Sequence, residues 1–109
     1  MSTNILLVCN EGMSTSYLVK KMQDVAKENQ INVNIKAIAE PHVDEESKTA
    51  DVILLGPQIS FMRNAIHARI GDRIPIEPIN PEDFGRINAA NVLKTALTLI
   101  RKNRQKEGE

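Results

Sequence analysis

The sequence of 109 residues contains very few aromatic residues and a single cysteine. Phenylalanine, tyrosine and tryptophan together make up 3% of the chain, so the core must be built from aliphatic side chains. One cysteine, Cys9, excludes an internal disulfide and a cysteine-cluster metal site. Lys+Arg and Asp+Glu number 14 each, and the resulting net charge of zero gives no general attraction to nucleic acid or lipid.

Long apolar runs are also missing, which bears on location. No run approaches the length of a membrane-spanning helix, and the short polar start is unlike a signal peptide. We therefore expect no membrane insertion and a reducing cytoplasm, where a thiol stays reduced. One domain is predicted over residues 1–104, followed by a frayed polar tail over 105–109. His42 and His67 lack ligand spacing, so neither metal nor cofactor is expected, and His67 is expected to be solvent-exposed.

Apolar runs alternate with amphipathic stretches along the chain. Continuous aliphatic runs predict strands buried on both faces at Ile5–Val8 and Asp51–Leu55, and alternation predicts an outer strand at Ile31–Ile38. Two prolines confine the extended segment Ile74–Ile79 to a sheet edge. Helical spacing predicts helices at Tyr17–Asn29, weakly at Val43–Thr49, at Ile59–Ile70 with Phe61 and Ala65 in its apolar stripe, and at Asn88–Arg104. Between the last strand and helix, Asn80 and Pro81 are typical of a helix start.

This order predicts an α/β fold, an open four-stranded parallel sheet with strand order 2-1-3-4 and helices on both faces. It is similar to the fold of low-molecular-weight tyrosine phosphatases. Strands one and three are then neighbours, and ligands bind where their carboxyl ends flank the topological switch point. Cys9 leaves the first of these strands and Gly56-Pro57-Gln58 leaves the other, so we expect them side by side.

The segment Cys9–Ser16 has the composition of an anion-binding loop that leads into a helix. Gly12 lets the backbone turn tightly, and Ser14, Thr15 and Ser16 offer hydroxyl donors or helix N-caps. A helix N-terminus attracts anions and favours the nucleophilic thiolate form of cysteine. The pattern leaves two interpretations open: a reactive thiol at an anion site, or a structural cysteine with capping hydroxyls.

A hydrolytic enzyme is the first functional candidate for such a loop. Low-molecular-weight tyrosine phosphatases and arsenate reductases use a cysteine, five residues and then an arginine that grips the phosphate. Here Thr15 stands at the arginine position, and the chain contains no Asp-Pro pair to supply their general acid. Without these groups, attack of water on a phosphocysteine is not assisted, which favours a carrier over a hydrolase.

Three segments resemble one family, the enzyme IIB subunits of the lactose/cellobiose class of the bacterial sugar phosphotransferase system. They are Leu7-Val8-Cys9 with Gly12-Met13-Ser14-Thr15-Ser16, then Ala50-Asp51-Val52 through Leu55-Gly56-Pro57-Gln58-Ile59, and Phe84-Gly85 with Val92-Leu93-Lys94. The resemblance covers essentially the whole chain, and the cysteine loop is its most specific part.

The resemblance implies a phosphoryl carrier. Cys9 would accept a phosphoryl group from a histidine of enzyme IIA and pass it to a sugar held by membrane enzyme IIC, at the inner face of the membrane. The sugar would be a β-linked disaccharide such as cellobiose, chitobiose or lactose. The phosphoryl oxygens would be held by the loop residues Asn10, Glu11, Gly12, Met13, Ser14, Thr15 and Ser16. Glu11 is acidic where small residues are usual, so we expect its side chain to point outward.

Four side chains near this loop have two readings each. Tyr17 either covers the phosphoryl site or packs at the helix start, and Gln58 either lines the docking surface or serves packing or turn formation. Lys20 and Lys21 either meet an acidic partner or lie on a solvated helix face. A further alternative is that the chain is a non-catalytic interaction domain, in which Cys9 has only a structural role.

Overall fold

The computed structural model describes residues 3–9 and 12–107. Its strands are β1 (Thr3–Cys9), β2 (Val33–Ala39), β3 (Val52–Leu55) and β4 (Ile76–Pro78). Its helices are α1 (Gly12–Glu28), α2 (Val43–Glu46), α3 (Arg63–Ile70), α4 (Pro81–Gly85) and α5 (Ala89–Glu107), with short 3-10 turns η1 (Glu40–His42), η2 (Ser47–Thr49) and η3 (Pro57–Met62).

The four strands form one parallel sheet in the order β2-β1-β3-β4, which confirms the predicted topology. The register places Val8 opposite Leu55, and Leu55 opposite Pro78. The carboxyl ends of β1, β3 and β4 therefore lie level with one another. As its prolines require, β4 is a short edge strand.

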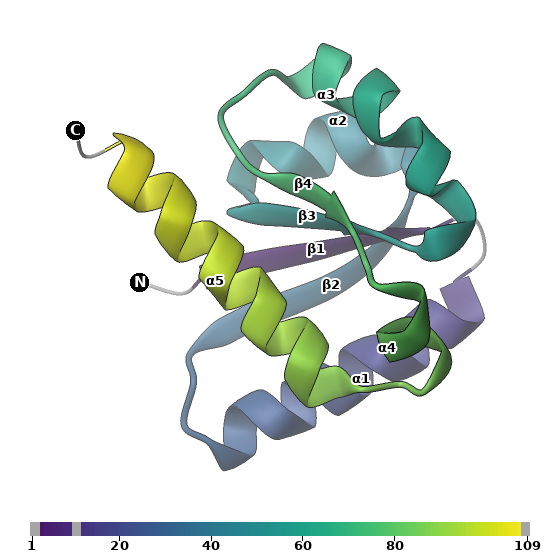
Figure 1. Ribbon diagram of the computed structural model, residues 1–109, viewed down its shortest axis with the longest axis vertical. Helices are drawn as coiled ribbons and strands as arrows, with labels where there is room; N and C mark the ends of the chain where they lie inside the picture. Colours follow the sequence, from purple (N-terminus) through teal and green to yellow (C-terminus); the bar gives the residue numbers. More distant parts are fainter. Residues whose placement is uncertain (1–2, 10–11, 108–109) are drawn as a thin grey trace.

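Helices cover the sheet on both faces (Figure 1). Aliphatic side chains of β1 and β3 pack against α1 and α5 on one face, and the opposite face packs against α2, η3 and α3. Side chains alternate along a strand, so Ile5, Leu7 and Cys9 point to the same face. Because Ile5 and Leu7 belong to the cluster under α1 and α5, Cys9 also lies on that side of the sheet.

Helix α1 begins at Gly12, five residues before the predicted start at Tyr17. The prediction that Ser14, Thr15 and Ser16 are N-caps is therefore wrong, since all three lie within the helix. Thr15 is buried and begins the stripe that continues through Leu18, Val19 and Met22. Adding a residue to an existing helix gains one backbone hydrogen bond, and packing of the apolar stripe supplies most of the stability of a helix in a protein. Both effects favour extension of α1 toward Cys9.

The segment predicted as one helix over Ile59–Ile70 is divided into η3 and α3. Ile59 has non-helical backbone angles (φ −119°, ψ 20°), which rotate the residues that follow it. As a result Ile59 and Ile66 are buried, whereas Phe61 is 79% exposed and Ala65 is also exposed. The predicted inward position of Phe61 and Ala65 is wrong because the 3-10 turn and the non-helical backbone of Ile59 shift the residues that follow off the spacing of a regular α-helix.

Helix α5 continues to Glu107, three residues beyond the predicted end at Arg104. The added residues, Gln105, Lys106 and Glu107, are good helix formers, and the first glycine of this region is Gly108. The buried face of α5 is the predicted one, with Val92, Leu93, Ala96 and Ile100 each at most 4% exposed.

Replacing Asn80 with alanine is expected to lower the free energy of unfolding by about 1 kcal/mol. The Asn80 side chain accepts hydrogen bonds from the backbone N–H groups of Glu82 (2.8 Å) and Asp83 (3.2 Å), which confirms the predicted cap of α4. Urea unfolding measures the difference. The control is Asn64→Ala, which removes an exposed asparagine from within α3 and should change stability by less than about 0.5 kcal/mol.

Candidate functional site

Cys9 is the last residue of β1 and is only 4% exposed. The backbone N–H of Gly56 donates to the carbonyl of Val8 at 2.8 Å, so the chain leaving β3 runs directly beside it. This confirms the prediction that the carboxyl ends of β1 and β3 lie side by side, at the switch point of the sheet.

Gly56 is the residue through which the two strand ends touch. A Cβ atom at this position would lie 3.4 Å from Cys9 Cβ and 3.0 Å from Gln58 Oε1. The backbone angles of Gly56 (φ −57°, ψ 145°) suit any residue, so the close approach, and not the conformation, favours glycine here. Sequence reasoning noted Gly56 only as a strand end, although a Gly-Pro pair directly after a buried strand signals such an approach.

Helix α1 begins three residues after Cys9. Two intervening residues limit the distance between the Cys9 and Gly12 Cα atoms to about 11 Å. The first backbone N–H groups of a helix have no intrahelical partner, and the first turn of α1 carries no acidic residue. The start of α1 can therefore offer donors to an anion attached at Cys9.

Thr15 is a buried residue close to this helix start, with 1% of its surface exposed. Among the side chains that the structure describes, its Oγ1 is the one buried nitrogen or oxygen atom that lacks a hydrogen-bond partner. A buried hydroxyl without a partner costs about 1–3 kcal/mol relative to a satisfied one. Such a group needs an explanation, and an anion bound nearby is one.

The other predicted loop residues are described only in part. Asn10 and Glu11 lie outside the described residues, so the expected outward direction of Glu11 stays a prediction. The backbone of Gly12, Met13 and Ser14 forms the first turn of α1, and the side chains of Met13 and Ser14 lie outside the described ones. Ser16 is exposed on the helix.

Tyr17 and Gln58 lie on the two segments that flank Cys9. Tyr17 is 49% exposed, and the Lys21 Nζ atom lies 5.5 Å from its ring centroid, as in a cation–π contact. The Gln58 side chain is exposed, yet its Oε1 reaches back toward Gly56. Phe61 follows on η3, and sequence reasoning missed it as a residue of this region because its spacing matched a buried helical stripe.

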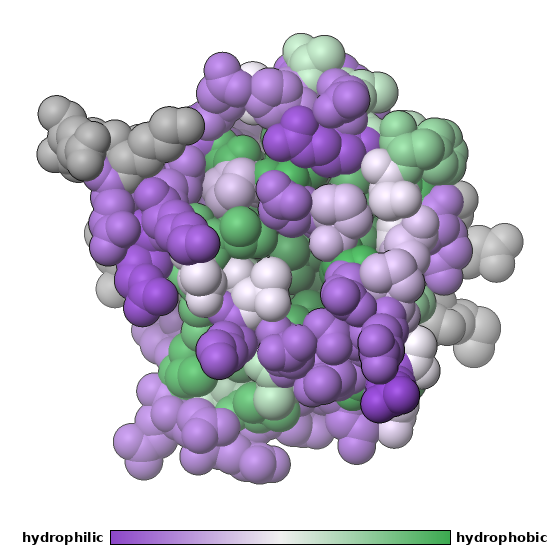
Figure 2. Space-filling view, viewed as in Figure 1, coloured by the Kyte–Doolittle hydropathy of each residue, from purple (hydrophilic) through white to green (hydrophobic). Residues whose placement is uncertain are grey.

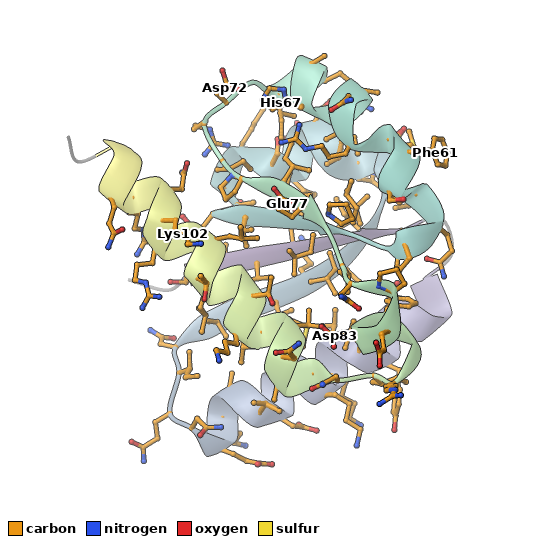
Figure 3. The ribbon with its side chains drawn as sticks, in the orientation of Figure 1. Phe61, His67, Asp72, Glu77, Asp83 and Lys102 are labelled. Carbon is orange, nitrogen blue, oxygen red and sulfur yellow. The ribbon has the colours of Figure 1, made fainter. Side chains whose placement is uncertain are left out.

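A separate cavity of about 580 Å³ lies along β4, away from Cys9. Figure 2 shows apolar atoms exposed in this hollow between polar side chains. Arg63 Nε donates to the carbonyl of Ile76 at 3.2 Å and so covers the open edge of the sheet. His67, predicted to be exposed, is half-buried here and pairs with Asp72 (Figure 3). The prediction is wrong because the chain turns back at Gly71 and brings this carboxylate onto the ring.

No group of three His, Cys, Asp or Glu side chains in residues 3–9 and 12–107 could hold a metal ion. None of the helices described in the structure is both long and apolar enough to cross a bilayer.

The protein is an α/β domain with a parallel sheet. Its cysteine lies at the end of the first strand, at the switch point and shortly before a long helix, so the protein belongs to the class of α/β domains with a thiol at this point. Residues 4–95 match the family described as the PTS system, lactose/cellobiose specific IIB subunit. The chain therefore belongs to the lactose/cellobiose-specific IIB family of the sugar phosphotransferase system. Proteins of this family are phosphotransferase components of sugar uptake, and they work with IIA and IIC partners.

Three relatives illustrate the similarity. The oligo-beta-mannoside-specific EIIB component of Bacillus subtilis (strain 168) is 33% identical over 97 residues, which cover 88% of this chain and 94% of the relative. The galactose-specific EIIB component of Lactococcus lactis subsp. cremoris (strain MG1363) is 38% identical over 103 residues, with the same coverage. The solution structure of a cellobiose-specific IIB component from Borrelia burgdorferi superposes with a TM-score of 0.81 at 41% identity, covering 94% of this chain and 95% of that one.

Proposed function

We propose that Cys9 is the residue of this IIB component that carries the phosphoryl group. Its sulfur attacks the phosphorus of a phosphohistidine on IIA, so that the S–P bond forms while the N–P bond breaks. The released imidazole takes the electron pair and the thiol proton. A hydroxyl oxygen of the sugar then attacks the same phosphorus, the S–P bond breaks, and the hydroxyl proton returns to the sulfur.

The place of Cys9 three residues before the start of α1 is the observation that carries this proposal. A phosphoryl group on the sulfur is a dianion, and the first N–H groups of the helix would donate charge-assisted hydrogen bonds to it, which are roughly twice as strong as neutral ones. The buried hydroxyl of Thr15 adds one further donor of the required kind. These donors hold a phosphoryl group without the arginine that a phosphatase of similar fold would use.

The experiment is transfer of labelled phosphate from phosphoenolpyruvate through the upstream phosphorelay proteins to the purified chain. We expect one phosphoryl group per chain, held by a bond that survives alkali and is cleaved by iodine, as thiophosphates are. An assay with a small aryl phosphate runs in parallel. Steady turnover of that ester, or labelling with the acid-labile, alkali-stable behaviour of a phosphohistidine on this chain, would contradict the proposal.

We propose a β-linked disaccharide as the final acceptor. The relatives are named for an oligo-beta-mannoside, for galactose and for cellobiose, and they are 33%, 38% and 41% identical to this chain. The same IIB fold therefore accompanies different sugars. Purified IIC partners supplied with different sugars would identify the acceptor, and transfer only to monosaccharides would contradict this assignment.

Replacing Gly56 with alanine is expected to slow the labelling of Cys9 by about tenfold while changing stability by less than about 1 kcal/mol. The added methyl group would contact Cys9 Cβ and push Gln58 Oε1 away, so the approach to the sulfur narrows. The rate of labelling and the urea midpoint measure the two effects. Gly85→Ala is the control, because a Cβ there meets no atom within 4 Å, and equal rates for the two variants would contradict the prediction.

A further inference from the structure

Two exposed aromatic side chains lie on the two segments that follow the strand ends at the candidate site. Phe61 is 79% exposed and Tyr17 is 49% exposed, and they are the exposed large apolar side chains of the described residues. The chain contains only three aromatic residues, and the third, Phe84, packs against the core. Because exposed aromatic rings are costly in water and are enriched in binding hot spots, their position indicates an interaction surface.

The two rings belong to the two segments that flank Cys9. Phe61 lies on η3, which begins directly after Gly56, and Tyr17 lies in the second turn of α1. Figure 1 shows the start of α1 and the segment after β3 at the same edge of the sheet, where β1 and β3 end. In Figure 3 the Phe61 ring projects from this edge into solvent.

The segment that displays Phe61 is anchored on both sides. Ile59 and Ile66 are fully buried in the core, and Arg63 Nε donates to the carbonyl of Ile76 in β4 at 3.2 Å. The backbone that carries the ring is therefore fixed before any partner binds. Binding through a pre-organised ring loses little conformational entropy, which makes Phe61 suitable as a docking residue.

Positive charge accompanies the aromatic ring on α1. Tyr17, Lys20 and Lys21 are three and four residues apart, so they share one helix face, and all three are exposed. Lys21 Nζ lies 5.5 Å from the centroid of the Tyr17 ring. This face offers a partner both apolar area and a favourable potential for negative charge.

We propose that Tyr17, Lys20, Lys21 and Phe61 form the docking surface for the phosphorylated donor subunit, an inference that rests on the proposed function of Cys9. The charge decides between the two partners of that function. The donor arrives with a phosphoryl dianion on its histidine, whereas the acceptor sugar is uncharged. When the donor docks, it covers the two rings and excludes water from the transfer.

The test measures the initial rate of Cys9 labelling at increasing concentrations of phosphorylated IIA. We expect Phe61→Ala to raise the IIA concentration at half-maximal rate about tenfold and to leave the saturating rate within about twofold. Phe61→Tyr, which keeps the ring, should behave as wild type. Lys20→Ala combined with Lys21→Ala should weaken the salt dependence of labelling, and Lys27→Ala, an exposed lysine in the last turn of α1, should not.

The possible outcomes distinguish failure of the proposed docking surface from failure of the proposed carrier function of Cys9. If wild type is labelled and Phe61→Ala matches it at every IIA concentration, the docking surface is wrong while the carrier function stands. If Phe61→Ala is labelled normally by IIA but passes the group to sugar more slowly, the surface belongs to IIC and the assignment to the donor is overturned. If wild type takes no phosphoryl group from IIA, both the proposed function and this inference fail. Thermal unfolding checks that the exposed substitutions leave the fold unchanged.

Discussion

Replacing Cys9 with serine is expected to reduce phosphoryl labelling by at least about 10³-fold, because the attacking atom is removed. A serine hydroxyl is a poor nucleophile unless a base activates it. Labelling by the phosphorelay measures this loss, and urea unfolding checks that the variant is still folded.

Cys9→Ala is a second variant that tests whether the sulfur of Cys9 carries the label. Alanine removes the sulfur without putting another nucleophile in its place, so it should lose labelling completely. If the alanine variant were still labelled, the phosphoryl group would be carried by another residue. If both variants unfolded at the labelling temperature, labelling at a lower temperature, where the folded fraction is known, would still compare them with wild type.

The sheet was predictable from the sequence because its signals are local. Continuous aliphatic runs identified β1 and β3 as buried strands, and the prolines at positions 75 and 78 fixed β4 at an edge. The helix boundaries were less predictable, since they depend on packing. Helix α1 begins at Gly12 and includes the buried Thr15, although threonine before an apolar stripe is typical of a polar cap.

Part of the candidate site followed from the sequence, and part needed the fold. The position of Cys9 beside Gly56 could be predicted because strand order alone brings the two strand ends together. The exposure of Phe61 could not, because it depends on the backbone angles of one residue, Ile59, which place the ring outside a stripe that its spacing fits. Helix propensity and apolar periodicity do not predict a change in the backbone angles of one residue.

Replacing Thr15 with valine is expected to increase stability and to impair function. Valine has nearly the shape of threonine but lacks the buried Oγ1 that has no hydrogen-bond partner, so the free energy of unfolding should rise by about 1–3 kcal/mol. If this hydroxyl donates to the phosphoryl group on Cys9, its loss removes a hydrogen bond to a charged group. Such a bond contributes about 1.5–3 kcal/mol, which corresponds to roughly a tenfold to hundredfold faster loss of label.

Ser47 provides the matched control for Thr15. It is the other buried polar side chain of the described residues, and its Oγ donates to the carbonyl of Asp44 at 3.1 Å. Ser47→Ala should therefore lower stability by about 1 kcal/mol and leave labelling unchanged. A gain in stability for Thr15→Val with a loss of function would mean that the chain retains a buried hydroxyl at a cost to folding because the phosphoryl group needs it. A gain with unchanged retention of the label would show instead that this hydroxyl has no part in the site.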